Sequence, residues 1–266
     1  MATVTLGSKA EGSIIKLKEN GKLVEFYVFK LNYESGLNGA GRVGIVRKDC
    51  YDQRQWHSSN VNAYATSDID TWLNGTYKKL FDADIQAAMG ETTFYYTPGN
   101  GNTTKTTLKR AVFLLSATEL GQTNTFLNAE GTALSIASAL KIAKLNGNAV
   151  DQWTRSPVKG VTGDVWFLLG NGDLGDYEYL SAVSRGARPA FTLPSTLYVS
   201  DDGSVFVNTA PSTPASISIP SAISGGTNIT VSWGASTDAE GNLSGYKVEK
   251  SANGGTSWSQ IYQGPE

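Results

Sequence analysis

Polar and apolar residues alternate along the start of the chain, as they do in half-buried β-strands. The alternation runs through residues 13–33 and is interrupted once, by Asn20-Gly21. This dipeptide is a strong signal for the two-residue turn of a β-hairpin. The pattern therefore predicts a hairpin here, followed by a third strand within residues 41–51.

The hydrophobic spacing then changes to three or four residues, which is typical of helices. Ser67 is a suitable N-cap for a short helix that Asn74-Gly75 would end. A second apolar stripe over residues 77–89 predicts another helix. A third is predicted over residues 135–147.

The segments between and after these helices read as loops and short strands. Residues 92–110 are polar and rich in glycine, and we expect an exposed loop there. Residues 111–116 are fully apolar and predict a short strand. Residues 188–208 predict a last hairpin around Asp202-Gly203.

The composition shifts at about residue 208, where three prolines fall within ten residues. Such a stretch marks a linker, which we place at 208–214, followed by an edge strand. Three further strands are expected within residues 228–264. The predicted domains are residues 1–208, of mixed α+β type, and residues 209–266, which are all-β.

Composition excludes some function classes. Charged residues make up 17% of the 266 residues and the formal net charge is −2, so the basic surface of a nucleic-acid-binding protein is not expected. Cys50 is the single cysteine, which excludes an intramolecular disulfide and fits assembly in a cytoplasm. We see no signal-peptide pattern and no run long enough to span a membrane.

Two arginines, Arg155 and Arg188, bracket an aromatic segment and each lies near a proline. A guanidinium has five donors and can bridge several loop carbonyls, so a structural role is expected for both arginines. The alternative is that they hold an acidic ligand. Trp153 and Phe167 are assigned to the core.

The residues between the arginines resemble those of a sugar- or protein-binding surface. Aromatic rings stack on sugars, and short polar side chains bond their hydroxyl groups. The alternative is that the aromatic residues fill the core. The ligand-binding candidates are Trp166, Asn171, Asp173, Asp176, Tyr177 and Tyr179.

Candidates for catalysis are few. His57 is the only histidine, so a site with several histidine ligands is excluded. The pairs Asp68/Asp70 and Asp82/Asp84 fall at predicted helix starts, where acids stabilise the helix dipole. Asp173 and Asp176 leave Ca²⁺ open as an alternative, although their spacing is not that of an EF-hand. We expect a protein that is not an enzyme and has no cofactor.

The order of several short motifs resembles a domain family of unknown function found in phage tail and adhesin-like proteins. The motifs include "GSIIKLKENGKLVEFYV", "VFLLSATELG", "WTRSP" and "RGARPAFTLPSTLYVSDDGSV". The resemblance implies a distant relation to the C-type-lectin-like fold, which has short helices and an irregular second sheet. Formylglycine-generating enzymes share this fold. Their activity needs reactive cysteines, which this chain lacks.

Residues 228–264 resemble the first half of a fibronectin type III domain. Trp233 lies where that family places a tryptophan on its second strand, and Tyr246 opens the third strand. The resemblance implies an incomplete sandwich, because the family has seven strands. Either the chain is a fragment of a longer protein or a partner supplies the missing strands.

Three functions follow as hypotheses. The first is a non-catalytic virion structural protein, a tail-associated adhesin that binds a host-surface glycan or protein. The second is a decoration or assembly protein of the particle, and the third is a carbohydrate-active enzyme or its accessory module. The first implies contacts with other virion proteins, no membrane insertion, and release from the host cytoplasm by lysis. The sequence leaves open whether the protein forms homo-oligomers.

Overall fold

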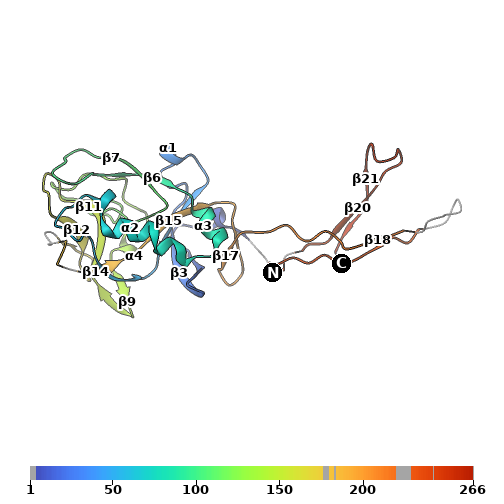
Figure 1. Cartoon of the computed structure of the whole chain (residues 1–266), viewed down its shortest axis with the longest axis horizontal. Helices are drawn as coiled ribbons and strands as arrows, with labels where there is room; N and C mark the ends of the chain where they lie inside the picture. Colours follow the sequence, from blue (N-terminus) through green and yellow to red (C-terminus); the bar gives the residue numbers. More distant parts are fainter. Residues whose placement is uncertain (1–3, 176–179, 183, 220–228, 242, 266) are drawn as a thin grey trace. The chain divides into compact units, whose positions relative to one another are not determined.

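The computed structural model describes residues 4–175, 180–182, 184–219, 229–241 and 243–265. Its contacts divide the chain into two compact units, Ala2–Val207 and Asn208–Glu266. We call them the first and the second unit and describe each by itself (Figure 1). The chain is mostly β, with a few short helices and several antiparallel sheets, in agreement with the broad fold class expected from the sequence.

The first unit contains an antiparallel five-stranded sheet with the order β2-β3-β4-β15-β8. The predicted hairpin is confirmed: Asn20 and Gly21 both have positive φ, at 49° and 74°, as a tight hairpin turn requires. The predicted third strand is also confirmed. The strands are β2 (Ile14–Glu19), β3 (Lys22–Lys30), β4 (Arg42–Arg47), β15 (Ala190–Pro194) and β8 (Val112–Phe113).

A second five-stranded sheet has the order β13-β12-β11-β14-β5. It is irregular, because β11 and β14 are parallel and the register of β11 against β12 shifts between Trp153 and Pro157. Most of the segment between the two arginines forms this sheet and its loops. The strands are β13 (Leu174–Gly175), β12 (Val165–Leu168), β11 (Gln152–Pro157), β14 (Ser184–Ala187) and β5 (Asp52–Gln55).

Among the described residues, the first unit has three smaller sheets. The hairpin predicted around Asp202-Gly203 is present as β16 and β17, which pair with β1. The other two are the hairpins β6-β7 and β9-β10. The strands are β1 (Val4–Thr5), β16 (Tyr198–Val199), β17 (Val205–Phe206), β6 (Thr92–Tyr96), β7 (Thr106–Arg110), β9 (Ala143–Leu145) and β10 (Asn148–Val150).

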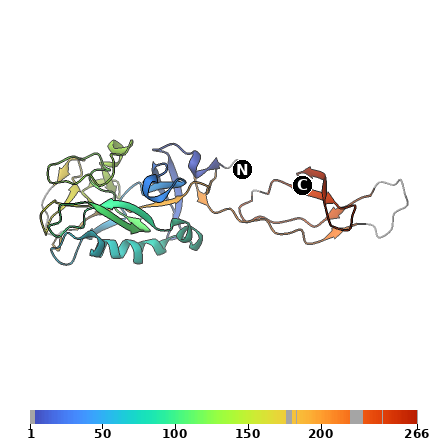
Figure 2. The same ribbon diagram turned by 90° about the horizontal axis from the view of Figure 1, so that it is seen from above.

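The helices are short, and those between residues 64 and 89 follow one another along one side of the first unit (Figure 2). The Ser67 side chain accepts a hydrogen bond from the Asp70 amide, which confirms the predicted cap. Among the described residues the helices are α1 (Ser35–Asn38), α2 (Asp68–Gly75), α3 (Ala83–Met89) and α4 (Ala137–Leu140), with 3₁₀ turns η1 (Leu6–Ser8), η2 (Tyr64–Thr66) and η3 (Tyr77–Leu80). No helix in these residues is long and apolar enough to cross a membrane.

Three predictions for this unit were wrong in part. Residues 92–110 are not an exposed loop, because β6 and β7 pair there and bury Thr92 and Phe94. The third predicted helix is reduced to α4, since Asn146-Gly147 forms the turn of the β9-β10 hairpin and does not end a helix. The stripe over residues 77–89 is split between η3 and α3.

One hydrophobic cluster forms the core of the first unit and includes residues of both five-stranded sheets and of α2, η3 and α3. Its aromatic rings pack mostly edge to face or tilted, for example Phe26 against Phe191 at 5.7 Å between centroids. A separate small cluster consists of Ala117, Val158 and Trp166. Leu174, which lies in the segment that the sequence identified as a candidate for binding, packs against this second cluster.

The second unit has two two-stranded sheets among its described residues, β18-β19 and β20-β21. Trp233 lies on β19, and its ring centroid is 5.5 Å from that of Tyr246, which opens β20. The Tyr246 hydroxyl accepts a hydrogen bond from the Ser236 amide at 2.6 Å. The strands are β18 (Ile217–Ser218), β19 (Ser232–Trp233), β20 (Tyr246–Lys250) and β21 (Ser259–Gly264).

Candidate functional site

Arg155, on β11, has a fully buried side chain. Its guanidinium donates to the carbonyl oxygens of Leu114 at 2.8 Å and Tyr95 at 3.1 Å, and forms an ion pair with Glu119 at 2.7 Å. Burial alone would lower the pKa of Arg155, but the neighbouring Glu119, Tyr33 and Glu130 together outweigh this effect and raise it. These contacts connect three separate segments of the first unit.

Two buried glutamates surround Arg155. Glu119 also accepts a hydrogen bond from the Tyr33 hydroxyl at 2.5 Å. Glu130 accepts hydrogen bonds from the Thr97 amide at 2.6 Å and from the Ser156 hydroxyl at 2.7 Å. Burial raises the pKa of Glu130 to about 7, against the opposing effects of the Arg155 charge and these hydrogen bonds.

Arg188 is a second buried arginine, at the C-terminal end of the segment that begins at Arg155. It is 4% exposed and donates to three carbonyl oxygens, those of Arg47 at 2.8 Å, Leu140 at 2.7 Å and Lys48 at 2.5 Å. Burial lowers its pKa from the usual value for arginine. Its three described acceptors are neutral carbonyls, so this arginine holds loops together.

Sequence reasoning missed a third arginine in the same frame. Arg185, on β14, forms an ion pair with Asp151, and its guanidinium lies 3.6 Å from the ring centroid of Phe167. Trp153 and Phe167 are both core residues, and the Trp153 indole donates to the Arg54 carbonyl at 2.8 Å. The spacing of Arg185 and Arg188 in "SRGAR" is the signal that could have identified it.

Trp166 does not lie on a contact surface. It is 3% exposed, packs in the small cluster with Ala117 and Val158, and donates from its indole nitrogen to the Phe126 carbonyl at 3.2 Å. The ring is therefore placed as a support beneath the loop that carries Phe126. The placement corrects the ligand-contact role, because strand β12 directs this side chain inward.

Asn171 and Asp173 are exposed, as a contact role requires. The Asn171 amide donates to the Asp173 carboxylate at 2.7 Å, and the Asp173 amide donates back to the Asn171 side chain at 3.1 Å. The two side chains thus hold each other in the tight connection between β12 and β13. The other candidates from this segment, Asp176, Tyr177 and Tyr179, lie outside the described residues.

Exposed apolar side chains lie in the loops near this connection. Phe126 is 54% exposed, Ile142 is 46% exposed and Leu169 is 36% exposed. The loops are in contact, because Gln122 donates to the Gly172 carbonyl at 3.2 Å, and Leu127 and Leu174 pack on the Trp166 cluster. We call the set formed by Phe126, Ile142, Leu169, Asn171 and Asp173 the loop surface.

Sequence reasoning missed the apolar members of the loop surface. Phe126 and Leu127 form a short apolar pair in the otherwise polar stretch "GQTNTFLNAEG", and this pair is the signal that could have identified Phe126. A large aromatic residue in a polar loop either packs inward or contributes to a binding surface. Phe126 is 54% exposed, so its ring does not pack inward.

The candidate catalytic groups are occupied by structural roles. Asp68 and Asp70 lie in the first turn of α2, and Asp82 and Asp84 at the start of α3, as predicted. Asp70 also pairs with Arg110 at 2.7 Å, and burial raises its pKa to about 6. Burial raises the pKa of Cys50 to about 12, so its thiol is protonated at neutral pH.

Glu34 and Glu119 are a pair of carboxylates that sequence reasoning missed. They line a hollow of about 200 Å³, in which Glu34 has a left-handed backbone with φ of 46°. Burial and the nearby Glu119 raise the pKa of Glu34. Glu119 is already bound to Arg155 and Tyr33, so its carboxylate is neither a free base nor a free nucleophile.

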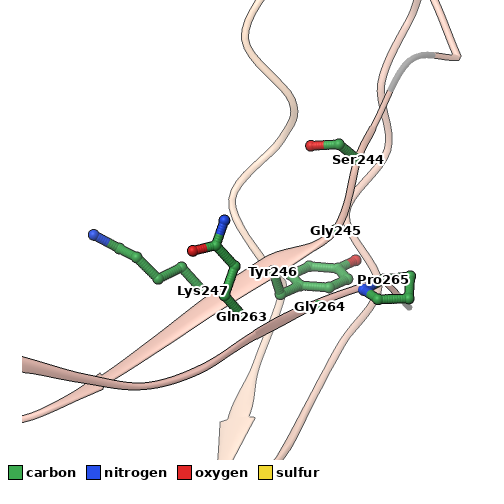
Figure 3. Close-up of a pocket in the computed structure, with 7 residues that line it drawn as sticks. All are labelled: Ser244, Gly245, Tyr246, Lys247, Gln263, Gly264 and Pro265. Atoms are coloured by element: carbon green, nitrogen blue, oxygen red, sulfur yellow. The ribbon is translucent and has the colours of Figure 1, made fainter.

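The second unit has a hollow of about 760 Å³ at the open end of the β20-β21 hairpin (Figure 3). Its lining is mostly polar, and Lys247 is the one Lys, Arg, Asp, Glu or His among its described lining residues. Lys247 pairs with Glu249 at 2.9 Å. This hollow therefore offers no pair of acid and base groups.

In the part of the chain that the structure describes, no group of three or more His, Cys, Asp or Glu side chains is placed to hold a metal ion. The Asp173 carboxylate has the Asn171 amide as its described side-chain partner. The loop surface thus presents amide, carboxylate and apolar groups on a frame fixed by buried arginines.

Comparison with protein families identifies the region that contains this surface. The family model described as Domain of unknown function (DUF6273) matches residues 40–195. The chain belongs to this family. Searches of curated proteins and of solved structures found no match.

The DUF6273 region begins just before β4 and ends just after β15. It therefore contains Arg155, Arg188, the whole second sheet and the loop surface. The β2-β3 hairpin and the second unit lie outside it. The resemblance to a domain of unknown function is thus confirmed over most of the first unit.

Proposed function

We propose that the chain is a non-catalytic virion structural protein, a tail-associated adhesin that binds a host-surface glycan or protein through the loop surface. The proposal includes a lectin-like fold for the first unit and a partial fibronectin type III fold for the second. The resemblance of the sequence motifs to phage tail and adhesin-like proteins supports it. The particle would assemble in the host cytoplasm and leave by lysis.

The observation that carries the proposal is the composition of the loop surface. Phe126 is 54% exposed and lies in loops that contact the turn with the Asn171 and Asp173 side chains. A flat ring on one loop and the amide and carboxylate groups of the turn that this loop contacts can bind the apolar face of a sugar and its hydroxyl groups together. A protein ligand would use the same groups.

The frame beneath this surface supports precise binding. Buried Arg155 and Arg188 connect the loops to both sheets, and Trp166 supports the loop with Phe126. Groups that are held in place before binding lose less conformational entropy when a ligand arrives. A rigid surface on exposed loops is therefore suited to recognition.

The experiment measures co-sedimentation of the full chain with purified cell walls from a panel of Gram-positive bacteria. We expect the chain to bind some of these walls, and Phe126→Ala to weaken binding roughly five- to thirtyfold, as loss of one aromatic contact does. Binding in EDTA should be unchanged, since no metal cofactor is proposed. Release of soluble sugars from the walls would contradict the non-catalytic part.

Leu23→Ala is the matched control, because Leu23 is 57% exposed in the same unit but lies on β3, outside the loop surface. Its binding and melting temperature should equal those of the unchanged chain. Absence of binding to every wall would favour a decoration or assembly role. Equal losses in both variants would remove the loop surface as the site.

A further inference from the structure

The second unit has almost no core of its own. None of its described residues is a buried hydrophobic residue, whereas the first unit has a large core cluster. Six of the twelve exposed large hydrophobic residues of the described chain belong to this much smaller unit. Its apolar side chains are therefore in water unless something covers them.

Five of these six exposed residues line one groove of about 520 Å³. Its apolar walls come from β18, β20 and β21 and the residues beside them. They are Ile217, Ile219, Ile229, Val231, Val248, Trp258 and Ile261, and Glu249 and Lys250 complete the lining. We call this set the apolar groove.

Isolated two-stranded sheets are marginally stable in water, because one hairpin cannot bury its own apolar face. Large exposed apolar patches mark interaction sites in soluble proteins. We propose that the apolar groove is a self-association site, covered by the same groove of a second copy of this chain. The two copies pack face to face about a two-fold axis.

The exposed area of the groove is the first argument for this occupant. Ile217, Ile219, Ile229, Trp258 and Ile261 are 47–70% exposed, which together equals about three fully exposed side chains. At roughly 150–200 Å² for each large side chain, one copy presents about 450–600 Å². Two copies bury roughly 1,000 Å², the size at which specific interfaces begin.

The charges of the groove are the second argument. Glu249 and Lys250 are adjacent residues of opposite sign. Glu249 forms an exposed ion pair with Lys247 of its own chain at 2.9 Å, and Lys250 has no ion pair among the residues that the structure describes. A two-fold axis between them reverses their order in the second copy. Glu249 of each copy then lies opposite Lys250 of the other, so the groove is complementary to itself.

The first experiment is sedimentation velocity of the full chain over a range of concentrations. We expect a reversible monomer–dimer equilibrium with a dissociation constant on the order of 1–100 µM, as expected for an interface of this size. Ile261→Lys should weaken the dimer at least about thirtyfold, because it places a charge in the apolar centre.

Leu23→Lys is the matched control, because Leu23 is 57% exposed and Ile261 is 54% exposed, and both lie on strands. The control should leave the dimer unchanged. A chain that stays monomeric at all concentrations would overturn the proposal and favour a different β-rich partner. Open-ended assemblies would also overturn it, since a two-fold interface closes at two copies.

Exchanging the charges of Glu249 and Lys250 tests the proposed two-fold axis. Lys250→Glu should weaken the dimer roughly five- to tenfold, because like charges then face each other. The double variant Glu249→Lys with Lys250→Glu should restore the original dissociation constant. A double variant that is as weak as the single one would contradict the two-fold arrangement.

Discussion

At the scale of single residues, buried cations hold the first unit together through carbonyl groups. Arg188 donates to three carbonyls from two separate segments, and Arg155 serves both carbonyls and Glu119. These carbonyls lie in or beside β4, β6, β8 and α4, and buried polar groups must be satisfied. The two arginines therefore supply donors to buried carbonyl groups outside the second sheet.

Arg188→Ala should destabilise the first unit by about 3 kcal/mol or more, because up to three buried carbonyls lose their donor. Chemical denaturation followed by tryptophan fluorescence measures the change. Lys109→Ala is the control, since Lys109 is 61% exposed in a surface ion pair and should change stability by less than about 0.5 kcal/mol. A stable Arg188→Ala chain that fails to bind cell walls would instead assign Arg188 to the ligand.

Glu130 gives the first unit a pH dependence. Its pKa is raised from 4.5 to about 7, so the folded protein binds more protons than the unfolded chain between these values. Stability from this group is complete below about pH 4.5 and is lost as the pH rises through 7. The loss is on the order of 3 kcal/mol.

Glu130→Gln should remove this slope, because glutamine keeps the shape of the protonated acid. The measurement is the free energy of unfolding between pH 5 and pH 8 for both proteins. Asp70, with a pKa near 6, adds a slope of the same sign to both, so their difference isolates Glu130. Parallel curves for the two proteins would show that Glu130 does not titrate in this range.

Some residue roles could be predicted from the sequence and some could not. Ser67 caps its helix because N-capping depends only on neighbouring residues. The inward direction of Trp166 depends on which face of β12 meets the Phe126 loop, 40 residues away in sequence. A binding role and a core role share the same local pattern, so the sequence left both open.

At the scale of elements, the hairpins with local turn signals were predictable. Asn20-Gly21 lies between alternating strands and forms a turn, as expected. Asn146-Gly147 follows a helical pattern, yet its positive φ angles serve the β9-β10 hairpin. The same dipeptide favours both structures, and the pairing of β9 with β10 decided between them. Residues 92–110 pair for a similar reason, since their polar residues face solvent on one side of a hairpin.

Asn74 shows how a residue expected to end a helix connects two elements. Helix α2 continues to Gly75. The Asn74 side chain donates to the Val112 carbonyl at 3.0 Å and accepts from the Ala111 and Val112 amides at 3.1 Å. The Asn74 side-chain amide thus forms hydrogen bonds with Ala111 and Val112 like those that the backbone of a neighbouring strand forms.

Asn74→Ala should destabilise the first unit by about 2–3 kcal/mol, because these backbone groups lose their partners. Urea denaturation measures the effect. Asn171→Ala is the matched control, since Asn171 is exposed and bonds within its own turn. Equal stability of the two variants would mean that water replaces the Asn74 contacts.

At the scale of the whole molecule, the two units differ in how far they bury their apolar side chains. The first unit buries them in one large cluster, whereas the second exposes them in the apolar groove. The sequence predicted the change of composition near residue 208 and the few strands after it. The face that stays uncovered depends on which strands pair, and the sequence pattern alone does not fix those pairs.

The most direct test of the proposed function uses one triple variant, Phe126→Ala, Asn171→Ala and Asp173→Ala, in the full chain. Its melting temperature should equal that of the unchanged protein, because all three side chains are exposed and none supports the core. Its dissociation constant for the cell walls that bind the unchanged protein should rise roughly 30- to 100-fold. A folded triple variant with an unchanged dissociation constant would contradict attachment through the loop surface.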